Sequence, residues 1–147
     1  MSYKFECSVE CPVEKDFAWR FWTDVANWSA VDSSVESVTL DGDFAAGTKG
    51  FTKPRGAEAT EWELLEVVPG ESAVIGIFLP GAVLKFRWQF ADSAAGGTLI
   101  SQRVTLAGEQ AGNYADGMKF LEKGIPEGMK SLAKGMVEAA ESGARIV

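Results

Sequence analysis

The chain has 147 residues, 46% of them hydrophobic, which suits one compact domain with a single buried core, and we expect residues 1–147 to form that domain. Its 14 Lys and Arg stand against 21 Asp and Glu, and the formal net charge of -7 opposes the phosphate contacts that dominate nucleic-acid binding. Nucleic acid and anionic membrane surfaces are therefore poor candidate partners, and no apolar run reaches the roughly 18 residues that membrane insertion requires.

The two cysteines indicate the redox state of the protein. Cys7 and Cys11 are the only cysteines, and the segment before them lacks the basic and apolar regions of a secretory signal. On one extended strand, at about 3.3 Å per residue, they would lie about 13 Å apart, whereas a disulfide spans at most about 7 Å between Cα atoms. We therefore expect two reduced thiols in a cytoplasmic protein.

The first third of the chain predicts one strand and two short helices. Residues from Tyr3 to Glu10 alternate between apolar and polar, the pattern of a strand with one buried face. Pro12 stands where the first turn of a helix tolerates proline. Apolar residues then follow at helical spacing, at Phe17, Phe21 and Val25. Asp24 is placed to cap a second short helix that runs to Val31.

The middle of the chain predicts an antiparallel meander. Short apolar runs are separated by turn residues such as "LDGD", "KPRG" and "VVPGES". Six strands fit between these turns: Ser34–Leu40, Thr48–Lys53, Ala59–Val67, Ala73–Leu79, Val83–Ala91 and Thr98–Ala107. Their even spacing and short connections favour consecutive hairpins over a parallel sheet.

The last segment predicts a long helix. One apolar stripe of period 3.6 comprises Tyr114, Met118, Leu121, Ile125, Met129, Leu132 and Met136. Because proline disfavours the helical conformation of the residue before it, Pro126 predicts a kink near Ile125 or two helices that meet there. Gly143 is placed to end the helix.

This order of elements resembles a known family. The resemblance rests on "CPVEKDFAWRFWTDVANWSAV", "LDGDFAAGTKG", "EWELLEVVPGES", "GGTLISQRVTLAG" and "GIPEGMKSLAKGMVEAAE". Together these stretches resemble the START-related, helix-grip (SRPBCC) superfamily, which includes pollen-allergen-like proteins and the bacterial polyketide cyclase/dehydrase and lipid-transport group. The resemblance implies an α+β fold in which a curved seven-stranded antiparallel sheet wraps around the long C-terminal helix, with two short helices after the first strand.

Strand alternation identifies the side chains that face the inside of such a sheet. Phe86 and Trp88 share one face of their strand, and Trp62 and Leu64 share one face of theirs. The last strand points Gln102 inward between apolar neighbours that include Val104. A buried amide without a partner costs about 1 to 3 kcal/mol, so Gln102 should bond to backbone, water or ligand. Weaker polar candidates of the same kind are Thr48, Thr52 and Thr60.

The helices supply the remaining candidate residues for a ligand site. In a helix-grip fold the first two helices close one end of the concave side of the sheet, and Trp28 would lie at the rim. Leu121, Gly128, Met129 and Leu132 come from the C-terminal helix. Gly124 and Gly128 would either let that helix approach the sheet closely or leave space for a ligand, with ordinary packing as the alternative. Trp19 lies off the main stripe, and we expect it to be exposed, at a homodimer contact.

The residue types exclude several kinds of chemistry. The chain has no histidine, which excludes Ser-His-Asp and Cys-His catalysis and the usual zinc sites. It also lacks a dinucleotide fingerprint and a P-loop. We therefore assign no catalytic residue, metal ligand or cofactor. Glu36, Glu58, Glu61, Glu63 and Glu66 are typical of a solvated acidic face.

Three functions remain as hypotheses. The first is a carrier or sensor that binds a small hydrophobic molecule, such as a lipid or polyketide-like compound, in an internal cavity. The second, implied by the resemblance, is a polyketide cyclase-like enzyme in which Gln102 polarises a carbonyl, with Glu36 or Glu66 as a base if either turns inward. The third is a protein-interaction module, like the chaperone-activating relatives, which would bind through an exposed apolar edge and need no cavity.

Overall fold

The computed structural model describes residues 2–146, and their side chains as far as Ser142. The elements follow one another as β1 (Ser2–Cys11), α1 (Lys15–Thr23), α2 (Ala26–Val31), β2 (Val35–Leu40), β3 (Lys49–Pro54), β4 (Thr60–Val68), β5 (Ser72–Leu79), β6 (Ala82–Asp92), β7 (Thr98–Ala107), the 3-10 helix η1 (Ala111–Tyr114) and α3 (Ala115–Ile146). The predicted α+β fold, with two short helices after the first strand and a long final helix, is confirmed.

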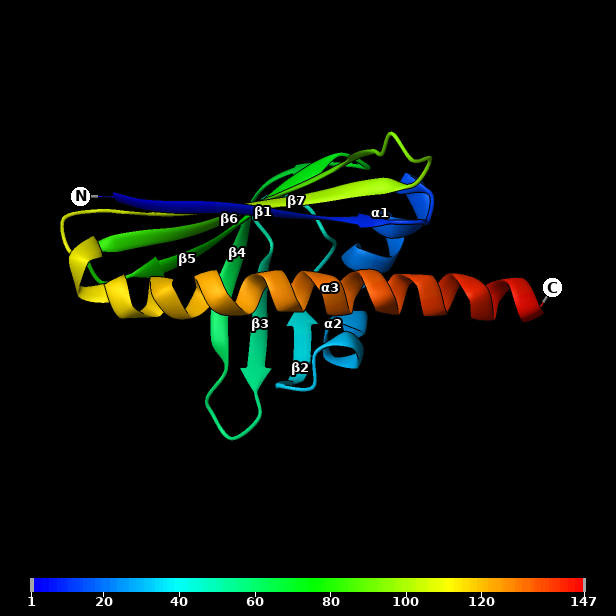
Figure 1. Ribbon diagram of the computed structural model, residues 1–147. Coiled ribbons are helices and arrows are strands. Elements are labelled where there is room, and N and C mark those ends of the chain that lie inside the picture. The colour runs from blue at the N-terminus through cyan, green and yellow to red at the C-terminus, as the bar shows by residue number, and fades with distance from the viewer. Residues whose placement is uncertain (1, 147) are drawn as a thin grey trace.

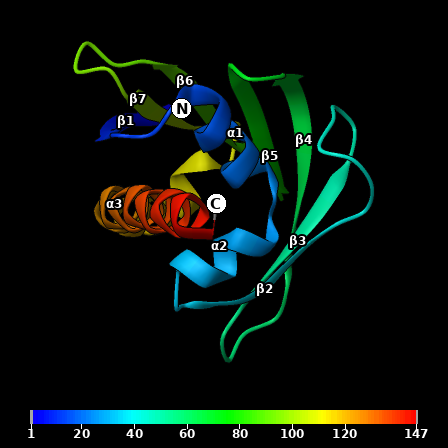
Figure 2. The ribbon, with the colours of Figure 1, turned by 90° about the vertical axis from the view of Figure 1, so that its right-hand side faces the viewer.

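The seven strands form one antiparallel sheet in the order β1-β7-β6-β5-β4-β3-β2. Strands β2 to β7 are consecutive hairpins, and β1 joins the sheet by pairing with β7 from Ser2↔Ala107 to Cys11↔Thr98. Register shifts interrupt the β2–β3 and β4–β5 pairs, and such bulges bend a strand and increase its twist. The sheet consequently curves around α3, as the view along that helix shows (Figure 2).

The core lies between the concave face of the sheet and α3, which runs beside β1 (Figure 1). Strand β7 shows why these residues form this layer, since its side chains alternate between the core and the outer surface. Helix α3 contributes the buried side chains of Met118, Met129, Leu132 and Met136 from its apolar stripe. No helix within the described residues is long and apolar enough to cross a membrane.

The helix ends predicted near Ile125 and at Gly143, and the cap predicted at Asp24, are wrong. Helix α3 continues through Pro126 and past Gly143 to Ile146, so two helices do not meet near Ile125. Proline removes one backbone hydrogen bond, to the carbonyl of Glu122, and because Glu122 is exposed, water can satisfy that carbonyl. Asp24 ends α1 and makes no side-chain cap for α2, whose first flanking residue is Val25.

Trp19 is partly buried and packs against the core, which corrects the prediction that it is exposed. Its ring meets Phe44 edge-on at 6.1 Å and Phe90 edge-on at 5.4 Å, and it lies 5.6 Å from the ring of Trp22. Phe44 comes from the connection between β2 and β3, so only the tertiary fold brings it to Trp19. A homodimer contact at Trp19 therefore loses its basis.

Gly135 lies at a close approach of α3 to α2. A Cβ atom at this position would overlap Cγ1 of Val31 and lie 3.7 Å from Cζ of Phe21. Because Val31 is β-branched and its χ1 angle is restricted, it has little room to move away. The absence of a side chain at Gly135 thus sets the distance between the two helices.

We expect Gly135→Ala to lower the free energy of unfolding by about 1 to 3 kcal/mol through overpacking, although alanine is the better helix former. Gly117→Ala is the matched control, because a Cβ atom there meets nothing within 4 Å and should raise stability by about 0.5 to 1 kcal/mol. Urea unfolding followed by circular dichroism measures both changes. Equal stabilisation by the two substitutions would contradict the close approach at Gly135.

Candidate functional site

A cavity of about 700 Å³ lies between the concave face of the sheet and α3. Its walls come from α1, α2, the α2–β2 connection, six of the seven strands, and residues 120–132 of α3. Most of the lining side chains are apolar. Because protein interiors are normally filled to crystal-like density, a space of this size within the fold is the first candidate for a site.

A row of four indole rings forms one wall of the cavity. Trp88 lies 4.9 Å from Trp22 between ring centroids, Trp22 stacks on Trp28 at 5.9 Å, and Trp28 stacks on Trp62 at 5.4 Å. The indole N–H of Trp28 donates to the carbonyl of Trp22 at 2.7 Å, and that of Trp62 donates to Oγ1 of Thr52 at 2.9 Å. These two bonds fix the rings of Trp28 and Trp62, and ring contacts join Trp22 and Trp88 to them, so the wall is preformed.

Gln102 places one polar group in this apolar space. It lies on β7 between Cys7 of β1 and Trp88 of β6, and its exposed fraction is 4%. Its amide forms no hydrogen bond with any side chain or backbone group of the described residues, yet no polar side-chain atom among them is fully enclosed without a partner. Gln102 also lines the cavity. Its amide therefore faces the cavity, where a guest molecule or water would satisfy it.

The other predicted site residues are divided between the cavity and the core. All the residues proposed above for a ligand site line the cavity except Leu64 and Val104, which are fully buried in the two clusters of the core. Thr52 and Thr60 also line it, whereas Thr48 does not. Contact with a ligand stays a prediction for each of these residues.

Sequence reasoning missed part of the lining, including Ile75 and Ile77 of β5. The run "SAVIGIFL" has buried residues in succession, so period-2 alternation gives no inward face. It also missed Asp32, Ser33 and Ser34, which reach the cavity only because the α2–β2 connection folds back against the sheet. No local signal in the sequence identifies such a connection.

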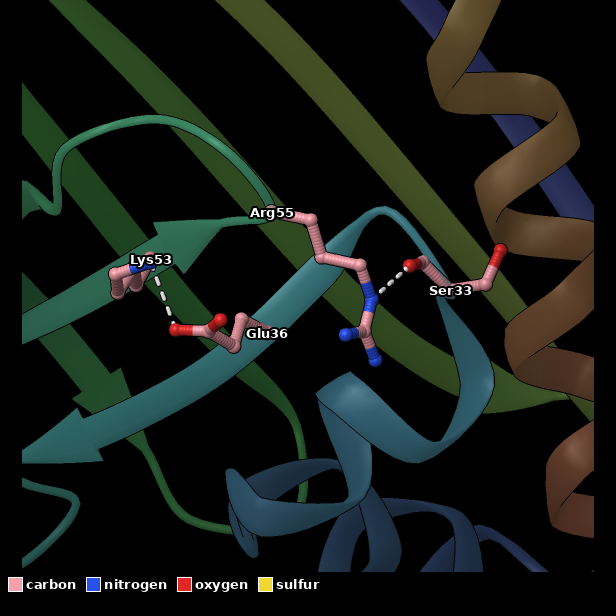
Figure 3. Close-up of polar contacts among 4 residues, drawn as sticks. All are labelled: Ser33, Glu36, Lys53 and Arg55. Carbon is pink, nitrogen blue, oxygen red and sulfur yellow. Dashed lines mark hydrogen bonds and ion pairs between the residues drawn. The ribbon is translucent and has the colours of Figure 1, made fainter.

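The rim of the cavity is held by polar contacts between the α2–β2 connection and the end of β3. The guanidinium Nε of Arg55 donates to the carbonyl of Ser33 at 2.8 Å, and the backbone N–H of Arg55 donates to the carbonyl of Ser34 at 3.0 Å. Nearby, Lys53 pairs with Glu36 at 2.7 Å (Figure 3). These contacts hold the connection in place beside the cavity.

Neither of the two carboxylates considered as a base lies in the cavity. The hydrogen bond and charge of Lys53, with a smaller contribution from Arg55, hold the pKa of Glu36 below its usual value. Glu66 pairs with Arg87 at 3.6 Å, and both partners are half exposed. Neither Glu36 nor Glu66 lines the cavity, so the condition placed on them, that one turns inward, is not met.

The two cysteines are free thiols, as predicted, and lie between β1 and α3. Sγ of Cys7 donates to Sδ of Met129 at 3.2 Å, and Sγ of Cys11 donates to the carbonyl of Ala133 at 3.5 Å. Burial raises the pKa of both thiols, partly offset at Cys11 by a backbone hydrogen bond from Val13. They are therefore protonated at neutral pH and serve as packing groups.

Gly124 and Gly128 leave the cavity open along α3. Both glycines line the cavity, both are exposed, and a Cβ atom at either position would meet nothing within 4 Å. The alternative of a close helix–sheet approach is therefore wrong for these two positions, and the close approach at Gly135 is to α2. Together with Phe120, which is 77% exposed, they form the α3 side of the cavity mouth.

Comparisons with known proteins agree with this architecture. A family model described as polyketide cyclase / dehydrase and lipid transport matches residues 2–141. Among solved structures, Ara h 8.0201 is 14% identical with a TM-score of 0.71 over 94% of this chain and 99% of its own. Protein NE0264 from Nitrosomonas europaea is 13% identical with a TM-score of 0.75 over 94% and 96%.

A third solved structure is the di-domain ARO/CYC StfQ from the steffimycin biosynthetic pathway. It is 16% identical with a TM-score of 0.74 over 98% of this chain, which spans 52% of the di-domain protein. Identities this low establish a likeness of fold alone. No curated protein matches the chain in sequence.

We expect leucine at Gly124 or Gly128 to narrow the mouth while stabilising α3, since glycine costs a helix about 1 kcal/mol. Uptake of the uncharged fluorophore N-phenyl-1-naphthylamine, followed by stopped-flow fluorescence, should slow about tenfold or more, which is about 1.4 kcal/mol in the barrier. Gly117→Leu is the matched control, because Gly117 is exposed on the same helix but does not line the cavity. Unchanged uptake in both mouth variants would show that the guest enters elsewhere.

Proposed function

We propose that this chain, which belongs to the polyketide cyclase / dehydrase and lipid transport family, binds a small hydrophobic molecule in its internal cavity and acts as its carrier or sensor. The family match extends over residues 2–141, nearly the whole chain, and the resemblance stated from the sequence is confirmed. The family supports a role in binding hydrophobic ligands or in cyclase-like chemistry. The choice between these two roles depends on the site itself.

The cavity is the observation that carries the proposal. Its volume of about 700 Å³ falls within the range of about 300 to 1,000 Å³ that is typical of small-molecule sites. Unfilled apolar space costs stability, because the lining side chains lose contacts that a packed core would give them. A guest of matching shape restores those contacts. Gln102 supplies the placed polar group that orients such a guest.

A cyclase-like enzyme is the second candidate, supported by the family description and by the fold shared with the ARO/CYC di-domain. In that role Gln102 would polarise a ligand carbonyl. A base would have to come from Asp32 or Glu127, the carboxylates among the described lining residues. Turnover that rises with the deprotonation of one carboxylate, and is lost in Asp32→Asn or Glu127→Gln, would favour this candidate over a carrier.

The third hypothesis, a protein-interaction module, is weakened by the packing of Trp19. That hypothesis required an exposed apolar edge, and Trp19 lies instead against Phe44 and Phe90. The large hydrophobic side chains that are exposed among the described residues are Phe78 and Phe120, which lie on β5 and α3. Phe120 belongs to the cavity mouth, so its exposure suits access of a ligand.

We expect Trp88→Ala to weaken binding of N-phenyl-1-naphthylamine about tenfold or more, because it removes one ring of the aromatic wall. This truncation also costs about 3 to 5 kcal/mol of stability, so a second variant is needed. Ile77→Phe adds volume to the cavity lining and should weaken binding by filling space.

Phe78→Ala is the control for both variants, because Phe78 is 63% exposed and does not line the cavity. Equilibrium fluorescence titration measures all three affinities, with circular dichroism to confirm folding. If Trp88→Ala and Ile77→Phe bind the probe as tightly as the unaltered protein, the cavity is not the binding site and the proposal fails.

A further inference from the structure

The charged residues of the cavity lining are all acidic. Asp32 and Glu127 line the cavity, and no Lys or Arg among the described residues does so. Asp32 lies on the α2–β2 connection, and Glu127 is exposed on α3. Oδ1 of Asp32 accepts hydrogen bonds from the backbone N–H of Ser34 at 2.9 Å and from its hydroxyl at 2.6 Å. The strands contribute no charged side chain to the lining.

Three of the basic side chains near the rim already have partners. Arg55 donates to the carbonyl of Ser33, and Lys53 pairs with Glu36 (Figure 3). On α3, Nζ of Lys130 pairs with Oε1 of Glu127 at 3.3 Å. A carboxylate that entered the cavity would lose its hydration without gaining a cation in the lining. Burial of an unpaired charge is among the most unfavourable transfers in a protein.

The cavity lining favours binding of a flat guest over binding of a flexible chain. Trp28 and Trp88 present partly exposed indole rings to the cavity. They pack against Trp22 and Trp62, which are 1% and 4% exposed, and adjacent rings of the row are inclined by 20° to 37°. Aromatic rings stack or meet edge to face with a gain of about 0.5 to 1.5 kcal/mol beyond area burial. A rigid polycyclic guest also loses less conformational entropy on binding than an alkyl chain of equal size.

The amide of Gln102 indicates which polar group the guest carries. An amide carries no charge and can donate and accept hydrogen bonds at once. Trp88 is its cross-strand neighbour on β6, so the amide lies at one end of the aromatic row. A hydroxyl or carbonyl oxygen on the ring system would satisfy the amide at this end.

From these observations we infer that the cavity selects an uncharged, flat aromatic ligand with one oxygen directed to Gln102, and that it rejects a carboxylate of the same shape. The inference rests on the proposed function and narrows its ligand from any hydrophobic molecule to one chemical class. It excludes fatty acids and other anionic lipids as the principal guest. The distinction between these ligands comes from the chemistry of the lining residues, because a fatty acid and an aromatic alcohol both have a hydrophobic part.

Four probes test the inference: 1-pyrenemethanol, 1-pyrenecarboxylate, unsubstituted pyrene and dodecanoate. Binding is followed at pH 7.5 and constant ionic strength by the quenching of tryptophan fluorescence, with dodecanoate also measured by competition. We expect 1-pyrenemethanol to bind about tenfold or more tighter than 1-pyrenecarboxylate and dodecanoate. Equal or tighter binding of either carboxylate overturns the inference. If none of the probes binds, the proposed function itself fails, and the inference fails with it.

A lysine placed in the lining tests whether the missing cation sets the preference. Thr60→Lys places a cation at an exposed position of the lining, and we expect it to strengthen 1-pyrenecarboxylate binding about threefold while 1-pyrenemethanol stays unchanged. Thr39→Lys is the control, because Thr39 is exposed on β2 and does not line the cavity. Equal gains in the two lysine variants would mean that net charge, and not the lining, sets the preference.

Gln102→Leu removes the amide but keeps a side chain of similar length. We expect it to weaken 1-pyrenemethanol about fivefold while leaving pyrene, which has no oxygen, unchanged. A parallel loss for both probes would show that Gln102 shapes the cavity without contacting the oxygen. That result would overturn the assigned orientation.

Discussion

The position of α3 over the concave face of the sheet is the constraint on which the other features depend. The helix packs against β1 on one side and against α2 on the other, while its contacts with the middle strands of the sheet are sparse. Gly135 fixes the α2 side, because any larger residue would collide with Val31. One helix held at these two supports cannot fill the inside of a seven-stranded curved sheet, and the remaining space is the cavity.

This arrangement lowers the stability of α3, whereas the aromatic wall contributes stabilising contacts. Glycine at positions 124 and 128 weakens a helix and contributes no packing, yet both residues adjoin the open space. The stacked tryptophans, in contrast, are fixed by their neighbours and by indole hydrogen bonds. Gly50 contributes to that order, since a side chain there would overlap the ring of Trp62 on the neighbouring strand. The site thus combines a rigid wall with an open mouth.

The sequence predicts the inward faces well where alternation is regular. Period-2 patterns identified Phe86, Trp88 and Gln102, and the stripe of α3 identified Met129 and Leu132. The same patterns cannot separate a residue that meets a cavity from one that meets another side chain, so Leu64 and Val104 were placed with the lining although they lie in the core.

Longer-range features lie beyond such patterns. Trp19 is covered by Phe44 from a distant loop, and the rim at Ser33 is held by Arg55, which is 22 residues further along the chain. The uninterrupted course of α3 through Pro126 likewise depends on its packing, which outweighs a local preference of the backbone. The local sequence pattern therefore predicts the fold class, whereas only the assembled structure shows where the core ends and the cavity begins.

Native mass spectrometry of the purified protein, recorded before and after addition of excess N-phenyl-1-naphthylamine, tests most directly whether the space holds a guest. We expect one small molecule per chain, either carried through purification or taken up from solution, and lost when the protein is denatured. A chain that remains bare in both spectra would contradict it.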